Sequence, residues 1–305
     1  MNQIDRHLLA TIADLHSIPA GAFNIRKDGQ SIDRNSTEHI QIIPKKDKPG
    51  IDIVFVPGTK NESCHIPVIL GASGLKDMVY NDFHIGPDCN VLIVAGCGIH
   101  NDGADDTQHD GIHTFYVGRN SHVKYVEKHF GEGSGTGKRV FNPKTVIYLE
   151  EGSSIELETV QIGGVSNTLR STYLEAGKNT EALLTERLMT HGDQTAESNM
   201  DVQLNGEGAS ARIISRSVAK DQSKQVFYPK MTGNAKSFGH VQCDSIIMDN
   251  ASVRSIPEIT ANTADAQLIH EAAIGRIAGD QLLKLMTLGL TSEEAEERIL
   301  TGFLK

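Results

Sequence analysis

The chain has 305 residues and a net charge of −10, with 39 acidic and 29 basic side chains. A nucleic-acid-binding protein would present a basic face, so the charge argues against that class. The four cysteines form no CxxC pair and are too few for a disulfide framework. The first 16 residues are amphipathic and carry acids, unlike a signal peptide, and no apolar run reaches the length of a membrane span. We therefore expect a cytoplasmic protein with reduced thiols.

The N-terminal part is expected to be a helical and loop region over residues 1–49. Ile4, Leu8, Ile12 and Leu15 recur at helical spacing and predict a helix over residues 4–16. The following stretch, which contains AGAFNIRKDGQS and the lysine run KKDK, has the composition of loops.

Residues 50–260 are expected to form an all-β core. Short β-branched runs alternate with turns, and one sequence pattern recurs. Apolar residues are followed by Gly or Asn, then by small or polar residues, and then by an alternating apolar run, as in FHIGPDCNVLIV (83–94), FYVGRNSHVKYV (115–126) and YLEAGKNTEALL (173–184). The turn glycines of the repeats are separated by 25 to 34 residues, and they are Gly86, Gly118, Gly152, Gly177, Gly208 and Gly233. Repeats of this length with two or three short strands each are typical of solenoids. Because the spacing is uneven, a strict repeat is not expected, and the pattern fits either a β-helix, which we favour, or an irregular β-sandwich.

The chain after Pro257 is expected to form a C-terminal helical region over residues 261–305. Three helices are predicted, over residues 264–277, 279–290 and 291–304, separated by glycines. Thr291 with Glu294 forms a capping box at the start of the last one. Such an appendage on a solenoid either covers its end or docks a partner.

Cys243, His270 and Glu271 are the first candidate site residues. A thiolate, an imidazole and a carboxylate can together accept sulfur or bind iron. Strand alternation places Cys243 on the same face as Val241 and Ser245, which also suits a buried core thiol. Adjacent helical positions point about 100° apart, so a single helix would not direct His270 and Glu271 at one metal.

Residues 97–113, CGIHNDGADDTQHDGIH, are the densest cluster of metal-ligand side chains. Cys97 and His100 have C-x2-H spacing, His109 and His113 have H-x3-H spacing, and four aspartates lie between them. These spacings suit a zinc or iron site. A long acidic surface loop with scattered histidines is the alternative interpretation.

The sequence GEGSGTGK at 131–138 resembles a phosphate-binding loop but does not match it. The pattern requires glycine where Glu132 stands, and Ser or Thr where Arg139 follows Lys138. A hairpin loop is favoured, and no nucleotide site is predicted.

Several motifs follow one another along the C-terminal half of the chain, among them NTLRSTYLEAGKNTEALL, GHVQCDSIIMDNA, PEI, HEAAIGRI and GDQLLKLMTLGL. These motifs and their order resemble those of the SufB and SufD proteins, the scaffold subunits of the SUF iron–sulfur cluster assembly system. The chain resembles this family from FNIRKDG at 23–29 to GF at 302–303, most strongly from residue 167 onwards. The resemblance implies a right-handed parallel β-helix flanked by helical regions. It also implies pairing of two subunits through their β-helices, and docking of SufC, an ABC-type ATPase, on the C-terminal helices.

The resemblance also assigns residue roles. Cys243 matches the cysteine of the QCDS motif, a sulfur or iron ligand, and His270 and Glu271 match the HEA motif at the same subunit interface. Longer SufB proteins carry a further cysteine in the middle of the β-helix, whereas this chain has none between residues 98 and 242, which leaves Cys97 as the nearest substitute. Ile269 stands where the family often has an acid. Because SufD generally lacks the cysteine that this chain carries, a homodimer is expected.

The resemblance therefore predicts an assembly scaffold and not an enzyme, with ATP hydrolysis in the SufC-like partner. Its cargo would be iron and a transient iron–sulfur cluster, and a separate protein would donate the sulfur. Two alternatives remain open. One is a SufD-like interaction scaffold with no ligand role, and the other is a metal-dependent enzyme on a β-solenoid.

Overall fold

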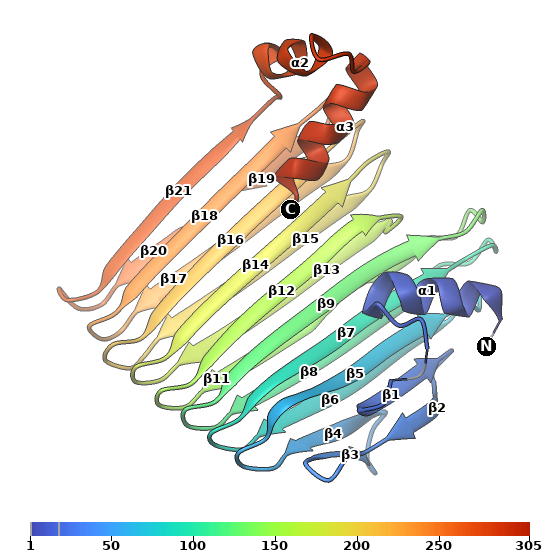
Figure 1. The fold of residues 1–305 in the computed structure, drawn as a ribbon. Coiled ribbons are helices and arrows are strands. Elements are labelled where there is room, and N and C mark those ends of the chain that lie inside the picture. The colour runs from blue at the N-terminus through green and yellow to red at the C-terminus, as the bar shows by residue number, and fades with distance from the viewer. Residues whose placement is uncertain (1, 18) are drawn as a thin grey trace.

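A computed structural model describes residues 2–17 and 19–305, and most of the chain winds through two long sheets (Figure 1). The first sheet has ten strands, in spatial order β2 (Gln30–Asn35), β1 (Ala22–Lys27), β5 (Lys60–Leu70), β7 (Asn90–His100), β9 (His122–Glu132), β12 (Ser154–Gly163), β14 (Glu181–Thr190), β16 (Ser210–Ala219), β18 (Phe238–Ile247) and β21 (Gln267–Gly275).

The second sheet has eleven strands. Its main path runs through β19 (Ser252–Ser255), β17 (Lys224–Gly233), β15 (Thr195–Leu204), β13 (Asn167–Ala176), β10 (Arg139–Phe141), β8 (Thr107–Val117), β6 (Lys76–Ile85), β4 (Gly50–Phe55) and β3 (Ile40–Pro44). Two further strands, β11 (Lys144–Leu149) and β20 (Glu258–Ala261), lie beside this path. The chain alternates between the sheets, and all pairings are parallel except β1–β2 and β3–β4. This confirms the parallel β-helix over the β-sandwich.

The coils stack in register, which explains the repeat seen in the sequence. Val91 pairs with Val123, an offset of 32 residues, whereas Ile155 pairs with Ala182, an offset of 27. Alternate residues of each strand point inward and form a continuous apolar core between the sheets. Within this core Phe83 stacks on Phe115 with ring centroids 4.2 Å apart.

The turns between the coils confirm five of the six predicted turn glycines. Neighbouring turns lie so close that a Cβ at Gly118 would be 2.7 Å from the carbonyl oxygen of Ile85 in the preceding coil. Any side chain there would force the stacked turns apart, which explains why glycine recurs. Gly233, the sixth, is the last residue of β17.

Two predictions of local structure are wrong. Residues 264–277 do not form a helix, because residues 267–275 form β21 and pair in register with β18. Pairing with the preceding coil and packing of Leu268 against the core outweigh the helix propensity of this alanine-rich segment.

The stretch expected to be a loop after the first helix contains the hairpin β1–β2. Its turn is Asp28–Gly29, both at positive φ, a two-residue hairpin signal.

The predicted N-terminal helix is confirmed as α1 (Gln3–Ala13), and it ends earlier than expected because Asp14 adopts a left-handed conformation with φ of 55°. It lies against the outer face of β5, β7 and β9. Gly96 and Gly98 of β7 make this approach possible. A Cβ at Gly96 would lie 2.4 Å from the carbonyl oxygen of Ile12, and one at Gly98 would lie 3.0 Å from Leu8 Cδ2.

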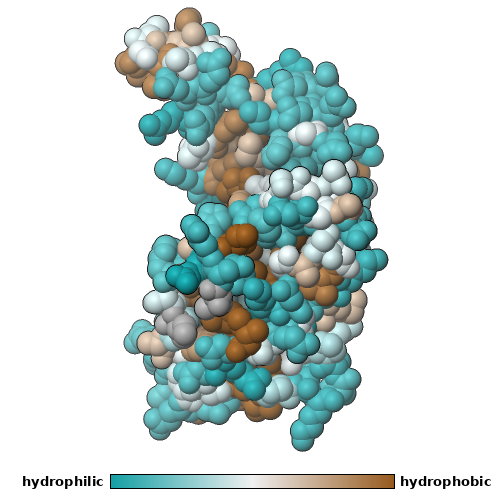
Figure 2. Space-filling model, turned by 90° about the vertical axis from the view of Figure 1, so that its right-hand side faces the viewer, coloured by the Kyte–Doolittle hydropathy of each residue, from teal (hydrophilic) through white to brown (hydrophobic). Residues whose placement is uncertain are grey.

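The last two predicted helices are confirmed as α2 (Gly279–Met286) and α3 (Ser292–Phe303). The capping box is present, since Thr291 Oγ1 accepts from the Glu294 amide at 3.2 Å. α3 packs on the solenoid through Leu300 and Leu304 against Val218. α2 buries none of its residues, and the lobe that carries it projects from one end of the molecule with apolar side chains exposed (Figures 1 and 2).

Candidate functional site

Cys243 lies on β18 with its side chain inside the solenoid. Val241, Cys243 and Ser245 are buried on the inner face, as strand alternation predicted, and Cys243 is only 2% exposed. Its register partners are Ser215 on β16 and Ala272 on β21. In the part of the chain that the structure describes, β21 is the one coil strand beyond it in the first sheet, so the thiol is close to the C-terminal end of the solenoid.

His270 reaches Cys243 from β21. It pairs in register with Val241, and its Nε2 lies 3.9 Å from Cys243 Sγ. A strand can place this pair together because His270, like Cys243, points to the inner face. The terminal coil therefore holds a thiol beside an imidazole, and the imidazole is only half-buried.

Glu271 lies on the opposite face of β21. Successive residues of a strand point to opposite sides. The Glu271 carboxylate accordingly faces outward and contacts His240 of β18, with Oε1 2.8 Å from Nε2. Within one chain, the structure thus joins Cys243 to His270 and joins Glu271 to His240 instead.

The protonation states at this site suit a resting thiol and a neutral imidazole. Burial, with smaller contributions from the carboxylates of Asp244 and Glu186, raises the pKa of Cys243 to about 11, although the Ser255 hydroxyl opposes the rise. Burial lowers the pKa of His270, although Glu271 acts in the opposite direction. The thiol therefore carries its proton at neutral pH, and the neighbouring imidazole has a free lone pair to accept it.

Cys97 of β7 lies in the core, whereas His100 is the last residue of the same strand. Cys97 is buried in an apolar cluster with Ile99 and Phe141, and this burial raises its pKa well above the ordinary value, assisted by nearby carboxylates. His100 is at the end of the strand, where Asp102 lies 2.8 Å from Nε2 and Glu132 lies 3.1 Å from Nδ1. Cys97 is thus a core thiol in this structure, and both ring nitrogens of His100 have carboxylate partners.

His109 and His113 belong to the second sheet, on the inner face of β8. Nδ1 of His109 lies 3.1 Å from a carboxylate oxygen of Asp77, and Nδ1 of His113 lies 2.7 Å from the Tyr125 hydroxyl. Across residues 2–17 and 19–305, no group of three or more His, Cys, Asp or Glu side chains is arranged to hold a metal ion. The structure therefore does not bring the four candidates of residues 97–113 together.

Two of the four aspartates of residues 97–113 have structural partners in the glycine-rich loop of the next coil. Asp102 accepts from the Ser134 amide at 2.7 Å, and Asp106 accepts from the Lys138 amide at 2.7 Å. The two loops stack so closely that a Cβ at Gly135 would be 2.2 Å from the Gly103 carbonyl oxygen. The resemblance to a phosphate loop arises from this stacking of loops.

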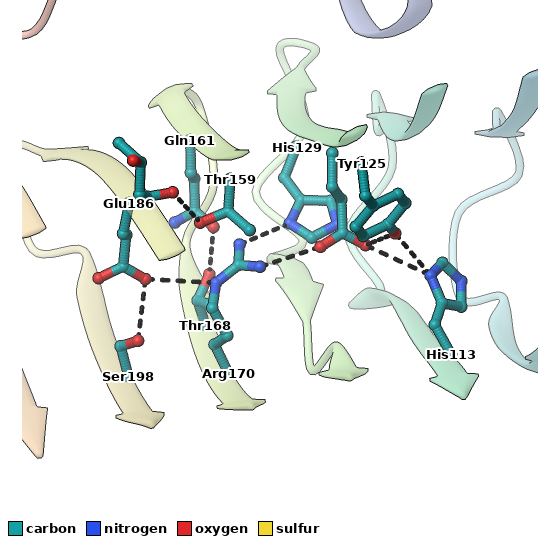
Figure 3. A network of polar contacts seen from close by, with 11 residues as sticks. His113, Tyr125, His129, Thr159, Gln161, Thr168, Arg170, Glu186 and Ser198 are labelled. Carbon is teal, nitrogen blue, oxygen red and sulfur yellow. Dashed lines mark hydrogen bonds and ion pairs between the residues drawn. The ribbon is translucent and has the colours of Figure 1, made fainter. Parts of the chain in front are cut away.

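A buried polar network inside the solenoid was not predicted. Arg170 of β13 points into the core, where Nη1 donates to Glu127 at 3.0 Å and Nε lies 3.4 Å from Glu186 (Figure 3). The network continues to the hydroxyl of Tyr125, 3.2 Å from Glu127, and to Ser198, which donates to Glu186 at 2.8 Å. The sequence does contain a signal, because Glu127, Arg170 and Glu186 occupy inward positions in the strand alternation.

The structure therefore defines a parallel β-solenoid whose C-terminal coil carries a paired thiol and imidazole. The family model described as "SUF system FeS cluster assembly, SufBD core domain" matches residues 80–303 of the chain. The chain belongs to this SufB/SufD family, as its ordered motifs predicted.

Similar curated proteins carry the same family description. An "Iron-sulfur cluster assembly SufBD family protein" of Archaeoglobus fulgidus is 28% identical over 279 residues, 89% of this chain and 72% of the relative. A relative from Methanocaldococcus jannaschii is 33% identical over 62% of this chain and 60% of its own length. One from Pyrococcus horikoshii is 29% identical over 77% of this chain and 71% of its own length. Although the match spans 72% of the first relative, it spans only 60–62% of three others. Among the described residues, no helix is both long and apolar enough to span a membrane.

Proposed function

We propose that this protein is a scaffold subunit on which an iron–sulfur cluster is assembled, with Cys243 and His270 as ligands for iron or sulfur. The observation that carries the proposal is the 3.9 Å approach of Cys243 Sγ to His270 Nε2 at the terminal coil. Membership of a family of iron–sulfur cluster assembly proteins supports the same conclusion. The cluster is cargo that is built and passed on, so the protein acts as a scaffold and not as an enzyme.

The chemistry of the pair suits cluster assembly. Thiolate and imidazole are both donors that iron accepts. Because the Cys243 thiol is protonated at rest, iron binding must release its proton, which the neutral His270 ring 3.9 Å away can accept and pass to solvent before Nε2 binds the metal. The buried thiol is thereby kept from reacting until iron or sulfur arrives.

The exposed edge of β21 supports a homodimer through the β-helix. In the described structure β21 is the last strand of its sheet, and it presents Ile269 and Ile274 at 49% and 42% exposure. A free edge with apolar side chains is a template for pairing with another chain. A second copy that paired there would cover the Cys243–His270 site. Glu271 would contribute to the cluster only from such a second copy, because within one chain it faces away.

The C-terminal helices support a docking site for a SufC-like ABC ATPase. Leu283 of α2 and Leu288, which follows that helix, are 61% and 76% exposed. An exposed apolar patch of this kind is typical of a surface that binds another protein. A hollow of about 540 Å³ between α3 and the solenoid, lined by Ile162, Met189 and Leu300, adds apolar surface beside it. ATP would be hydrolysed in that partner, a separate protein would donate the sulfur, and the assembly would work in the cytoplasm.

Anaerobic reconstitution tests the proposed ligands. Purified protein would be mixed with iron and sulfide, with and without the ATPase, and its visible charge-transfer bands recorded. We expect bands from the wild type that disappear in Cys243→Ala and persist in Cys64→Ala, a matched change of a buried thiol in another coil. Bands that survive in Cys243→Ala would contradict the role of Cys243 and point to Cys97.

An interaction scaffold without ligands is the second candidate, favoured by the outward orientation of Glu271. This alternative predicts that a triple variant of Cys243, His270 and Glu271 still supports cluster assembly when its partners are present. Size-exclusion chromatography of the triple variant with the ATPase would show whether complex formation alone carries the function.

A further inference from the structure

Five of the six tyrosines lie on the outer face of the second sheet. Each occupies a strand position whose neighbours in the sequence point into the core, and they are Tyr80 on β6, Tyr116 on β8, Tyr148 on β11, Tyr173 on β13 and Tyr228 on β17. Tyr116 and Tyr148 are 45% and 36% exposed, and their rings stack with centroids 5.5 Å apart. Tyrosine combines a large apolar ring with a polar hydroxyl and is enriched at surfaces that bind other proteins. This face is therefore a candidate binding surface.

A groove of about 910 Å³ crosses this face over β15, and we call it the tyrosine groove. Its walls are Tyr148 and Tyr173 on one side and Tyr228, Ile256 and Pro257 on the other. Shorter side chains of β15 form its floor. Because β15 is already paired with β13 and β17, its backbone cannot accept a further strand. A ligand in the groove would therefore be held by side chains.

The floor of the tyrosine groove presents polar side chains at regular intervals. Glu197, Asn199 and Asp201 occupy alternate positions of β15 and line the groove. Alternate residues of a strand are about 7 Å apart. An extended peptide has the same spacing, so its residues i, i+2 and i+4 can meet these three side chains in turn.

The two carboxylates of the floor have neutral partners. Glu197 accepts a hydrogen bond from Nδ2 of Asn199 at 3.0 Å, and Asp201 accepts one from Nε2 of Gln203 at 2.6 Å. An amide orients a carboxylate without cancelling its charge. Both carboxylates can therefore bind a cation from a ligand.

The two lysines that line the groove leave this negative charge in place. Lys230 is the register partner of Asp201, but its ammonium lies 3.4 Å from the Glu258 carboxylate instead. Lys144 stands on β11, two strands away from β15. Tyr173 is the register partner of Asp201 on the other side, so a basic side chain there can contact a carboxylate and an aromatic ring together. The groove thus complements a cationic ligand and would repel the phosphates of a nucleic acid.

We propose that the tyrosine groove binds an extended segment of a partner protein that has two basic residues four positions apart. One basic side chain meets Asp201 and the ring of Tyr173, and the other meets Glu197. The residue midway between them lies over Asn199. The groove is on the outer face of the second sheet, whereas Cys243 is on the inner face of the first, so this binding requires neither iron nor the thiol.

Fluorescence anisotropy with labelled peptides tests the proposal on the full chain. The first peptide is Ser-Arg-Thr-Ser-Thr-Arg-Ser, whose arginines are four positions apart. The second, Ser-Arg-Thr-Ser-Arg-Thr-Ser, has the same composition with a spacing of three, and the third has glutamate in place of both arginines. We expect the first peptide to bind and the third not to bind. The second should bind at least about fivefold more weakly, because its arginines point to opposite sides of an extended chain.

Matched variants locate the binding. The double change Glu197→Gln with Asp201→Asn, and the single change Tyr173→Leu, should each weaken binding of the first peptide about tenfold. Asp110→Asn and Tyr80→Leu alter the same outer face outside the groove and should leave the affinity within about twofold of the wild type. Circular dichroism would confirm that the strands persist in every variant.

Three results would overturn the proposal. The first is equal binding of the two arginine peptides, or equal weakening by the Asp110 and Tyr80 variants. The second is retarded migration of the wild type in a gel with soluble β-glucan that Tyr173→Leu abolishes, which would assign the groove to a carbohydrate. The third is self-association that Tyr173→Leu abolishes in sedimentation, which would assign it to a second copy of the chain. The reconstituted cluster bands should persist in Tyr173→Leu, so the scaffold function and the groove are tested separately.

Discussion

Arg170 holds Glu127 and Glu186 together across the interior of the solenoid, with its guanidinium 3.0 Å and 3.4 Å from the two carboxylates. The three residues come from β13, β9 and β14, so the contact joins both sheets. All three side chains are at least 94% buried. A cation between two carboxylates cancels much of the repulsion that would otherwise keep them out of the core.

Replacing Arg170 should therefore destabilise the solenoid strongly. Arg170→Met keeps most of the side-chain volume but leaves two buried carboxylates without their cation, and we expect a loss of about 3–5 kcal/mol in the free energy of unfolding. Urea unfolding followed by circular dichroism would measure it. Arg187→Met is the matched control, because Arg187 pairs with Glu158 on the outer face, where both side chains are about a quarter exposed. Such a pair contributes at most about 1 kcal/mol, so similar losses in both variants would contradict the prediction.

The same network should make the protein sensitive to acid. His129 belongs to this network, because its Nδ1 lies 3.1 Å from Nη2 of Arg170. Burial lowers the pKa of His129 to about 3, although Glu127 acts in the opposite direction. The ordinary histidine pKa is about 6.5. Between these values the unfolded chain binds a proton on His129 that the folded chain does not, so stability falls as the pH drops through this interval. Burial would raise the pKa of Glu127, but the neighbouring His129 and Arg170 lower that pKa to about 2. The ordinary glutamate pKa is about 4.3, so the protein loses further stability as the pH falls from about 4.3 to 2.

Urea midpoints measured from neutral pH downward would check this dependence. His129→Asn removes the titrating ring and retains an oxygen that can accept from Arg170. We expect a flatter profile for this variant between pH values of about 6.5 and 4.5. A wild-type midpoint that stays constant over that interval would show that His129 titrates normally in the folded protein.

The sequence predicted the solenoid because its signals are local and repeated. Inward alternation and the turn glycines of stacked coils, such as Gly86 and Gly118, are each visible within a few residues. The strand β21 was mistaken for a helix because alanine-rich segments favour helices, and only pairing with β18 overrides that preference. The hairpin β1–β2 was missed although its Asp28–Gly29 turn is a local signal.

The site was harder to predict than the fold. Cys243 and His270 were identified from motifs, but their contact depends on β21 being a strand in register, which no local pattern states. The candidate metal ligands of residues 97–113 do not converge on one site in the described structure. His100 lies on one sheet and His109 on the other, and each already has a carboxylate partner. Each spacing lies within one strand: Cys97 and His100 are three positions apart and point to opposite faces of β7, whereas His109 and His113 share a face of β8 but are about 13 Å apart along it.

The contact of α1 with the solenoid should depend on Gly96. In Gly96→Ala the new Cβ would overlap the Ile12 carbonyl oxygen, so α1 must move outward or detach. We expect a loss of about 1–3 kcal/mol, typical of overpacking, and faster proteolysis within residues 3–13. Gly275→Ala is the control, because a Cβ at Gly275 meets no atom within 4 Å. Equal proteolysis of the two variants would show that Gly96 does not govern the docking of α1.

His270 and Glu271, although adjacent in the sequence, should respond differently to substitution. His270 faces Cys243 from the inner side of β21, so His270→Ala removes a donor and the proton acceptor of the thiol. We expect its affinity for Fe²⁺ to fall at least about tenfold, measured anaerobically by equilibrium titration of the charge-transfer bands. Glu271 faces His240 on the outer side, so Glu271→Gln, which preserves shape, should leave the affinity of the isolated chain within about twofold of the wild type. If Glu271→Gln instead abolishes the bands, and does so only at concentrations where the wild type is dimeric, the carboxylate reaches the cluster from a second copy of the chain. If His270→Ala binds iron normally, the contact between His270 and Cys243 has no part in holding the metal.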